Sequence, residues 1–110
     1  MIAAQTRLQP AVALFRSLAD PTRLSIVRRL ADSEARVVDL VRDLELPQST
    51  VSTHLACLRE CALVNGRVEG RQIFYSLARP ELLVLLSSAE GLLAATGEQV
   101  ALCPRYGDPV

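Results

Sequence analysis

Two cysteines, Cys57 and Cys61, stand four residues apart in a stretch, residues 48–62, whose apolar side chains recur at helical spacing. On a helix this spacing places their Cβ atoms about 5–6 Å apart on one side. A disulfide requires a Cβ separation of about 3.5–4.5 Å, whereas a metal ion bonded to both sulfurs at about 2.3 Å spans the wider gap. The pair is therefore a candidate metal site. The simplest alternative is that each cysteine is a small apolar core residue.

The composition limits the classes of protein to which the chain can belong. Its 110 residues fit one domain, and the odd number of cysteines, three, favours metal or redox chemistry over a disulfide framework. No apolar run reaches the roughly 18 residues of a membrane span, and the first residues lack the pattern of a signal peptide. We therefore expect a cytoplasmic protein with no membrane partner. No nucleophile–base pair, glycine-rich phosphate loop or acid dyad stands out, so we expect no enzyme.

Four helices are predicted in the first half of the chain. The first covers residues 10–18, and an Asp-Pro pair at positions 20–21 begins the second as an N-cap and a first-turn proline. A short third helix covers residues 38–44. The Leu-Pro pair at positions 46–47 ends it, because a residue before proline avoids the α conformation. With the fourth helix at residues 48–62, the short and the longer helix form the outline of a helix-turn-helix.

A β-hairpin is predicted directly after the fourth helix. Residues 67–68 and 73–77 are rich in side chains that favour strands, and the turn at 69–71 contains a glycine. A hairpin in this position is a wing. The predicted fold is therefore mainly α with a β-hairpin wing, a winged helix-turn-helix of about five helices.

The last predicted helix, from residue 80 to about 96, is rich in leucine. Its apolar surface is larger than a single small chain can bury. We expect it to pack against a second copy of the chain, which makes the protein a homodimer. Residues 1–97 form one DNA-binding and dimerisation domain in this prediction, and residues 98–110 form a C-terminal tail.

The fourth helix has one apolar and one polar side. Its short hydroxyl side chains lie opposite the apolar stripe, where they suit close approach to base edges and phosphates in the major groove. The formal net charge is zero, but arginines are frequent in this helix and in the wing, where acidic residues are few. The predicted DNA-contacting residues are Gln48, Ser49, Thr50, Ser52, Thr53, His54, Arg67 and Arg71.

Three blocks of sequence resemble the ArsR/SmtB family of metal-responsive repressors. They are LADPTR at residues 18–23, LPQSTVSTHL at 46–55 and EGRQIFYSL at 69–77, within a similarity that runs from Phe15 to Leu86. The resemblance implies a dimer closed by the first and last helices. It also implies repression of metal-efflux or resistance genes through double-stranded operator DNA until an ion binds.

Two metal sites known in that family are missing from this sequence. Residues 36–38 (RVV) replace the Cys-Val-Cys motif of the third helix, and residues 79–81 (RPE) replace the Asp-x-His pair of the last helix. The remaining thiols, Cys57, Cys61 and Cys103, are similar to those of the family's cadmium and lead sensors. Three sulfur ligands select soft ions, so Cd(II) or Pb(II) is the expected inducer, with trivalent arsenic as a competitor.

Other interpretations of the same residues stay open. His54 lies three residues before Cys57 and could act as a fourth ligand. A disulfide between Cys103 and one of the paired cysteines would instead make the protein a redox-responsive repressor. A third possibility is a helical dimerisation module without a role in DNA binding.

Overall fold

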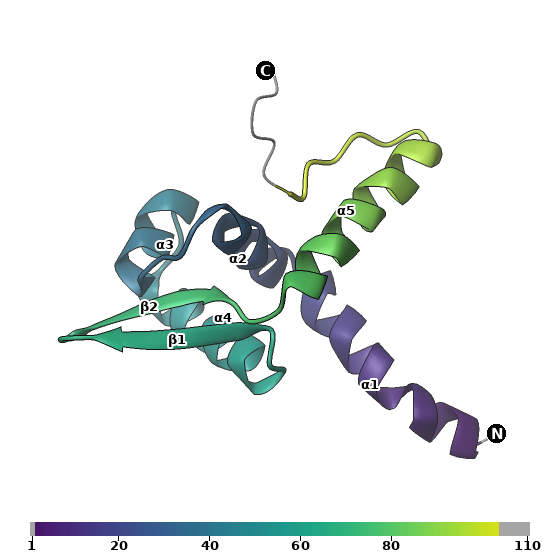
Figure 1. Cartoon of the computed structure of the whole chain (residues 1–110), viewed down its shortest axis with the longest axis horizontal. Helices are drawn as coiled ribbons and strands as arrows, with labels where there is room; N and C mark the ends of the chain where they lie inside the picture. The colour runs from purple at the N-terminus through teal and green to yellow at the C-terminus, as the bar shows by residue number, and fades with distance from the viewer. Residues whose placement is uncertain (1, 104–110) are drawn as a thin grey trace.

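The computed structural model describes residues 2–103 of the chain, with side chains from Thr6 onward. Helices α1 (Ile2–Ala19) and α5 (Pro80–Ala95) project as two arms from a body made of the other helices and a hairpin (Figure 1). The radius of gyration is 15.3 Å, larger than the roughly 13 Å of a compact domain of this length. The projecting arms contribute to this larger radius (Figure 1). The predicted mainly α fold with a β-hairpin wing is confirmed.

The helix-turn-helix unit consists of α2 (Pro21–Asp32), α3 (Val37–Leu44) and α4 (Gln48–Glu60). Asp20 is the N-cap of α2, as predicted, and its carboxylate accepts a hydrogen bond of 2.9 Å from the backbone N–H of Arg23. This bond satisfies one of the unpaired N–H groups of the first helical turn. The predicted boundaries of these helices are correct to within two residues.

The C-terminus of α4 differs from the prediction, because the helix ends at Glu60 rather than at residue 62. Ala62 adopts a left-handed conformation, with φ of 60°. Its N–H donates to the carbonyl of Arg59, and the N–H of Leu63 donates to the carbonyl of Leu58, both at 3.0 Å. These two bonds form a Schellman cap, which closes the helix although no glycine is present. Ala62 is consequently exposed rather than part of the apolar stripe.

Helix α1 also departs from the prediction, since it begins at Ile2 and not at residue 10. Pro10 lies inside the helix, where a proline removes one backbone hydrogen bond. The residues before it include alanine and glutamine, which are strong helix formers, so the helix continues on both sides of the proline.

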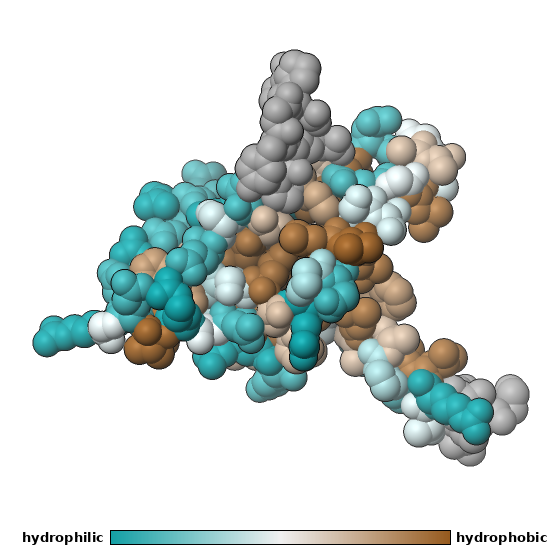
Figure 2. Space-filling model, viewed as in Figure 1, coloured by the Kyte–Doolittle hydropathy of each residue, from teal (hydrophilic) through white to brown (hydrophobic). Residues whose placement is uncertain are grey.

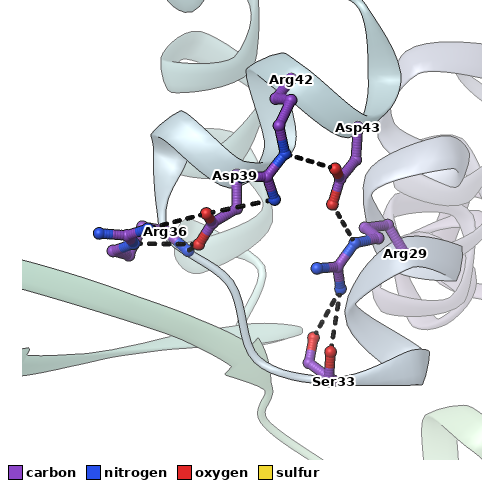
Figure 3. A network of polar contacts seen from close by, with 6 residues as sticks. All are labelled: Arg29, Ser33, Arg36, Asp39, Arg42 and Asp43. Carbon is purple, nitrogen blue, oxygen red and sulfur yellow. Dashed lines mark hydrogen bonds and ion pairs between the residues drawn. The ribbon is translucent and has the colours of Figure 1, made fainter.

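A network of charged side chains fixes α3 against α2 (Figure 3). Arg29 of α2 donates to Asp43 of α3 at 3.0 Å, and Arg42 donates to the other oxygen of Asp43 at 2.9 Å. At the start of α3, Asp39 accepts bonds from both the backbone N–H and the guanidinium of Arg36, each at 3.0 Å. These hydrogen bonds lower the pKa of Asp39 well below its ordinary value. The network holds the short helix that supports α4.

The wing is an antiparallel pair of strands, β1 (Val64–Glu69) and β2 (Gln72–Leu77). Gly70 and Arg71 form the two-residue loop between them, and Gly70 has a positive φ of 64°. Such a tight loop requires positive φ, which glycine adopts without strain. The predicted hairpin is confirmed.

A two-sided backbone contact joins the wing to the helical body. Ala35, in the loop between α2 and α3, exchanges hydrogen bonds of 3.0 and 2.8 Å with Tyr75 of β2. The fully buried side chains of the core come from the three helices of the body: Ile26, Val27, Leu40, Val51, Leu55 and Leu58.

The start of the predicted C-terminal tail packs against the core. Leu102 is 6% exposed and belongs to the apolar cluster. The backbone N–H groups of Leu102 and Cys103 donate to the Glu90 carboxylate of α5, at 2.6 and 3.3 Å. The rest of the predicted tail, residues 104–110, lies outside the described residues.

Within residues 2–103, no helix is both long and apolar enough to cross a membrane.

Candidate DNA interface and thiol pair

Helix α4 separates a buried side from a polar side. Val51, Leu55 and Leu58 face the core, and each is at most 2% exposed. The sequence-predicted contact residues of the opposite side are exposed from the start of the helix onward; these are Gln48, Ser49, Ser52 and Thr53, while Thr50 is half-buried. Short hydroxyl and amide groups on an exposed helix face can form hydrogen bonds with base edges and phosphates.

The N-terminus of α4 has no side-chain cap. The N-cap residue is Pro47, which offers no side-chain acceptor to the first-turn N–H groups. Backbone N–H groups at the start of a helix favour a phosphate group, because the helix dipole adds positive charge there. The exposed side chains of this turn belong to Gln48 and Ser49.

His54 is half-buried between α4 and α2 rather than fully on the exposed face. Its Nδ1 lies 3.4 Å from the Arg23 guanidinium and 3.9 Å from the Asp20 carboxylate. A guanidinium has only donors, so a hydrogen bond from Arg23 uses Nδ1 as the acceptor and, in the neutral ring, leaves the proton on Nε2. The Arg23 contact thus sets the direction of the ring, and Nε2 is the atom left for a DNA contact.

The two wing arginines have different surroundings. Arg71 is exposed in the tip loop of the hairpin. Arg67 lies on β1 and donates hydrogen bonds to Glu69 and Glu34. Its guanidinium also stacks on the Phe74 ring, with the Cζ atom 5.0 Å from the ring centre. The Glu69 and Glu34 carboxylates raise the pKa of Arg67. Two acidic partners therefore compensate the charge of Arg67.

The two predicted thiols lie near the C-terminal end of α4, and one of them contacts α1. Cys57 is half-buried, and Cys61 is exposed in the C-cap. The Cys61 sulfur lies 3.1 Å from the hydroxyl oxygen of Ser17 on α1. His54, Cys57 and Cys61 follow one another at intervals of three and four residues, which is the spacing of one helix face.

The third predicted thiol lies elsewhere in the chain. The Cys103 thiol donates to the carbonyl oxygen of Leu83 on α5 at 3.5 Å. Within residues 2–103 of one chain, no three His, Cys, Asp or Glu side chains come together in a group that could hold a metal ion. A single chain in this conformation brings Cys57 and Cys61 to one helix face but does not bring Cys103 to them.

Sequence reasoning missed three residues that position this region: Ser17, Arg23 and Glu90. Arg23 follows a recognisable N-cap signal at Asp20, so its place at the start of α2 could have been found. Ser17 could not, because its contact joins helices that are far apart in the sequence, and Glu90 could not, because its contact depends on how the tail folds back onto α5.

An open groove of about 390 Å³ lies between the start of α3, the start of α4 and β2. Its walls are mostly apolar, and its charged lining residue, Arg36, is already paired with Asp39. This groove offers no further charged group for a ligand.

The comparisons with known proteins agree with this geometry. The family model described as "Bacterial regulatory protein, arsR family" matches residues 20–66, from the N-cap of α2 into β1. The chain is 38% identical over 106 residues to the HTH-type transcriptional regulator CmtR of Mycobacterium tuberculosis, covering 96% of this chain and 90% of CmtR. It is 34% identical over 91 residues to the probable mercury resistance operon repressor of Streptomyces lividans, covering 83% of this chain and 73% of that repressor.

Among solved structures, the chain resembles the homodimeric winged helix-turn-helix DNA-binding domain of Mb0332 from Mycobacterium bovis. The TM-score is 0.77 at 24% sequence identity, and the similarity covers 86% of this chain and 87% of that domain. At this level of identity the likeness shows the winged helix-turn-helix fold.

Proposed function

Because this chain belongs to the arsR family of bacterial regulatory proteins, we propose that it is a homodimeric repressor that binds operator DNA and releases it when its thiols bind Cd(II) or Pb(II). One observation carries the proposal. Helix α4 presents exposed hydroxyl and amide side chains on one side and two cysteines on another, so one helix can respond to both DNA and a thiophilic ion.

DNA binding would use the polar side of α4 together with the wing. The exposed residues of this side would contact base edges and phosphates; these are Gln48, Ser49, Ser52 and Thr53. Thr50 and Nε2 of His54 would contact the nearby sugar-phosphate backbone of the DNA. Arg71 at the tip of the wing would reach a phosphate or the minor groove. Arg67 would contribute less than Arg71, since Glu34 and Glu69 already compensate its charge.

Dimer formation is supported by apolar side chains that the monomer leaves in water on both arms. On this face of the molecule, hydrophobic side chains gather where α1 and α5 leave the body (Figure 2). A second copy of the chain would cover such surface, and a two-fold dimer places its two recognition helices in successive major grooves, about 34–36 Å apart. The exposed apolar residues of the arms are Leu8, Val12 and Phe15 on α1 and Leu83, Val84 and Leu92 on α5.

The donor set fits a soft metal ion. Cys57 and Cys61 are accessible on one helix face, and Cys103 lies in a tail anchored to α5 by Leu102 and Glu90. The third sulfur would come from the same chain, after it leaves the Leu83 carbonyl, or from the partner subunit's Cys103. When bound, the ion would supply strong bonds to these sulfurs.

The chain's own residues would turn such ligation into a change of DNA affinity. Two of the thiols belong to the helix that contacts DNA, and the third belongs to a tail held on a dimer arm. Joining them would favour a different angle between α4 and the arms, and therefore a different spacing of the two recognition helices. By linkage, DNA must weaken metal binding by the same factor by which metal weakens DNA binding.

The direct test uses a duplex selected by the metal-free protein from a randomised pool. Fluorescence anisotropy would follow its release during titration with Cd(II), Pb(II), Hg(II) and arsenite.

Ultraviolet thiolate-to-metal bands in the parent and in Cys57→Ser, Cys61→Ser and Cys103→Ser would count the sulfurs in the site. Cys57→Ser and Cys61→Ser should bind DNA normally but should not release it. If none of these ions released the DNA, metal sensing would be refuted. Release of the DNA by peroxide without any metal would favour the redox alternative.

A further inference from the structure

Ser17 joins the dimer arm α1 to the thiol side of α4. It is a polar residue, yet it is buried and only 5% exposed. Its hydroxyl donates to the carbonyl of Ala13, one turn earlier in α1, at 2.9 Å. The same oxygen lies 3.1 Å from the sulfur of Cys61.

The single proton of the Ser17 hydroxyl determines which group is the donor in the contact between Ser17 and Cys61. A serine hydroxyl carries one proton, and Ser17 uses it on the Ala13 carbonyl. In the contact with Cys61, the Ser17 oxygen is therefore the acceptor, and the S–H group of Cys61 is the donor. This contact requires a sulfur that still carries its proton.

A second contact holds the same side of α4 to the end of α1. Arg23 donates to the Ser17 carbonyl at 2.9 Å, and its guanidinium lies 3.4 Å from Nδ1 of His54. His54 and Cys61 are seven residues apart, so they lie two turns apart on one face, with Cys57 between them. The last turn of α1 is thus linked to α4 directly, through Ser17 and the Cys61 thiol, and indirectly, through Arg23 of α2.

We propose that Ser17 is a coupling residue through which ligation of Cys61 is transmitted to the dimer arm. This inference rests on the proposed metal-sensing function. A sulfur bonded to a metal ion is a thiolate and has no proton to donate to Ser17. The Ser17 hydroxyl must then lose this partner or turn its own proton from Ala13 to the sulfur. Either outcome changes the contact between α1 and α4, and α1 is the helix that packs against the partner subunit in the proposed dimer.

The variant Ser17→Ala tests the proposal with little risk to folding. Alanine is the best helix former, and the exposed Cys61 thiol can donate to water instead. Ser25→Ala is a matched control, because Ser25 donates to the carbonyl of Pro21, four residues earlier, in the same way but contacts no thiol. Ser17→Thr keeps the hydroxyl and should restore the behaviour of the parent chain.

Two measurements distinguish coupling from a structural role. The first is the ratio of operator affinities without and with Cd(II). Ser17→Ala should lower this ratio about fivefold while leaving metal-free DNA binding within about twofold, the scale set by loss of one hydrogen bond. The second is the alkylation rate of Cys61 by iodoacetamide in metal-free protein, followed by mass spectrometry. This rate should rise about threefold in Ser17→Ala and stay unchanged in Ser25→Ala.

Each result decides between the alternatives. If Cd(II) weakens operator binding by the parent chain and by Ser17→Ala to the same extent, the coupling role is refuted and the proposed function stands. If Cd(II) does not change operator binding by the parent chain, both the coupling role and the proposed function fail. An unfolded Ser17→Ala by circular dichroism, or an unchanged alkylation rate, would also overturn the role assigned to Ser17.

Discussion

Replacing Phe15 by serine should break the proposed dimer without unfolding the chain. Phe15 is 59% exposed on α1 and is not among the side chains that pack against the core cluster. A phenylalanine side chain presents roughly 200 Å² to solvent, so about 120 Å² of apolar surface is available on each chain. If the dimer covers half of it on both chains, about 120 Å² is buried in total, worth about 3 kcal/mol at roughly 25 cal/mol per Å².

That free energy corresponds to an increase of about 100-fold in the dimer dissociation constant. Sedimentation equilibrium over a range of protein concentrations measures this constant directly. Val68→Ser is the matched control, because Val68 is 72% exposed on the wing, away from both arms. Equal dissociation constants for Phe15→Ser and the parent chain, or a parent chain that is monomeric at tens of micromolar, would show that α1 does not form the dimer.

Three further predictions concern the wing, the support of α3 and the tail. Arg71→Ala should weaken operator binding and reduce the salt slope by about 1, as measured by anisotropy over a range of salt concentrations, whereas Arg67→Ala should have a smaller effect. Because Arg36 lowers the pKa of Asp39 below the ordinary 3.8, the stability from this pair is present above about pH 4 and lost as the pH falls. The urea midpoint should therefore fall less between pH 5 and pH 3 in Asp39→Asn than in the parent chain. Leu102→Ala should lower the free energy of unfolding by about 2 kcal/mol in urea titrations, since it removes a buried side chain; no change would mean that the tail is not anchored.

Most of the secondary structure could be predicted from local sequence signals. The Asp-Pro pair at positions 20–21 marks the start of α2 because the capping bond spans only three residues. The hairpin loop is marked by Gly70, which supplies the positive φ that a two-residue turn requires. The two errors also have local causes. Pro10 lies within α1 instead of starting it, and Ala62 occupies a left-handed position that glycine usually marks.

The sequence by itself determined which residues face the core and which thiols share a helix, because helical periodicity and capping depend on neighbours a few positions away. It also predicted the polar side of α4 on the same ground. Only the tertiary structure decided that Cys61 contacts Ser17, that Arg23 orients His54, and that Cys103 rests on α5. The first two contacts depend on how helices distant in the sequence pack together, and the third depends on how the tail folds back onto α5. No local pattern of residue types encodes that packing.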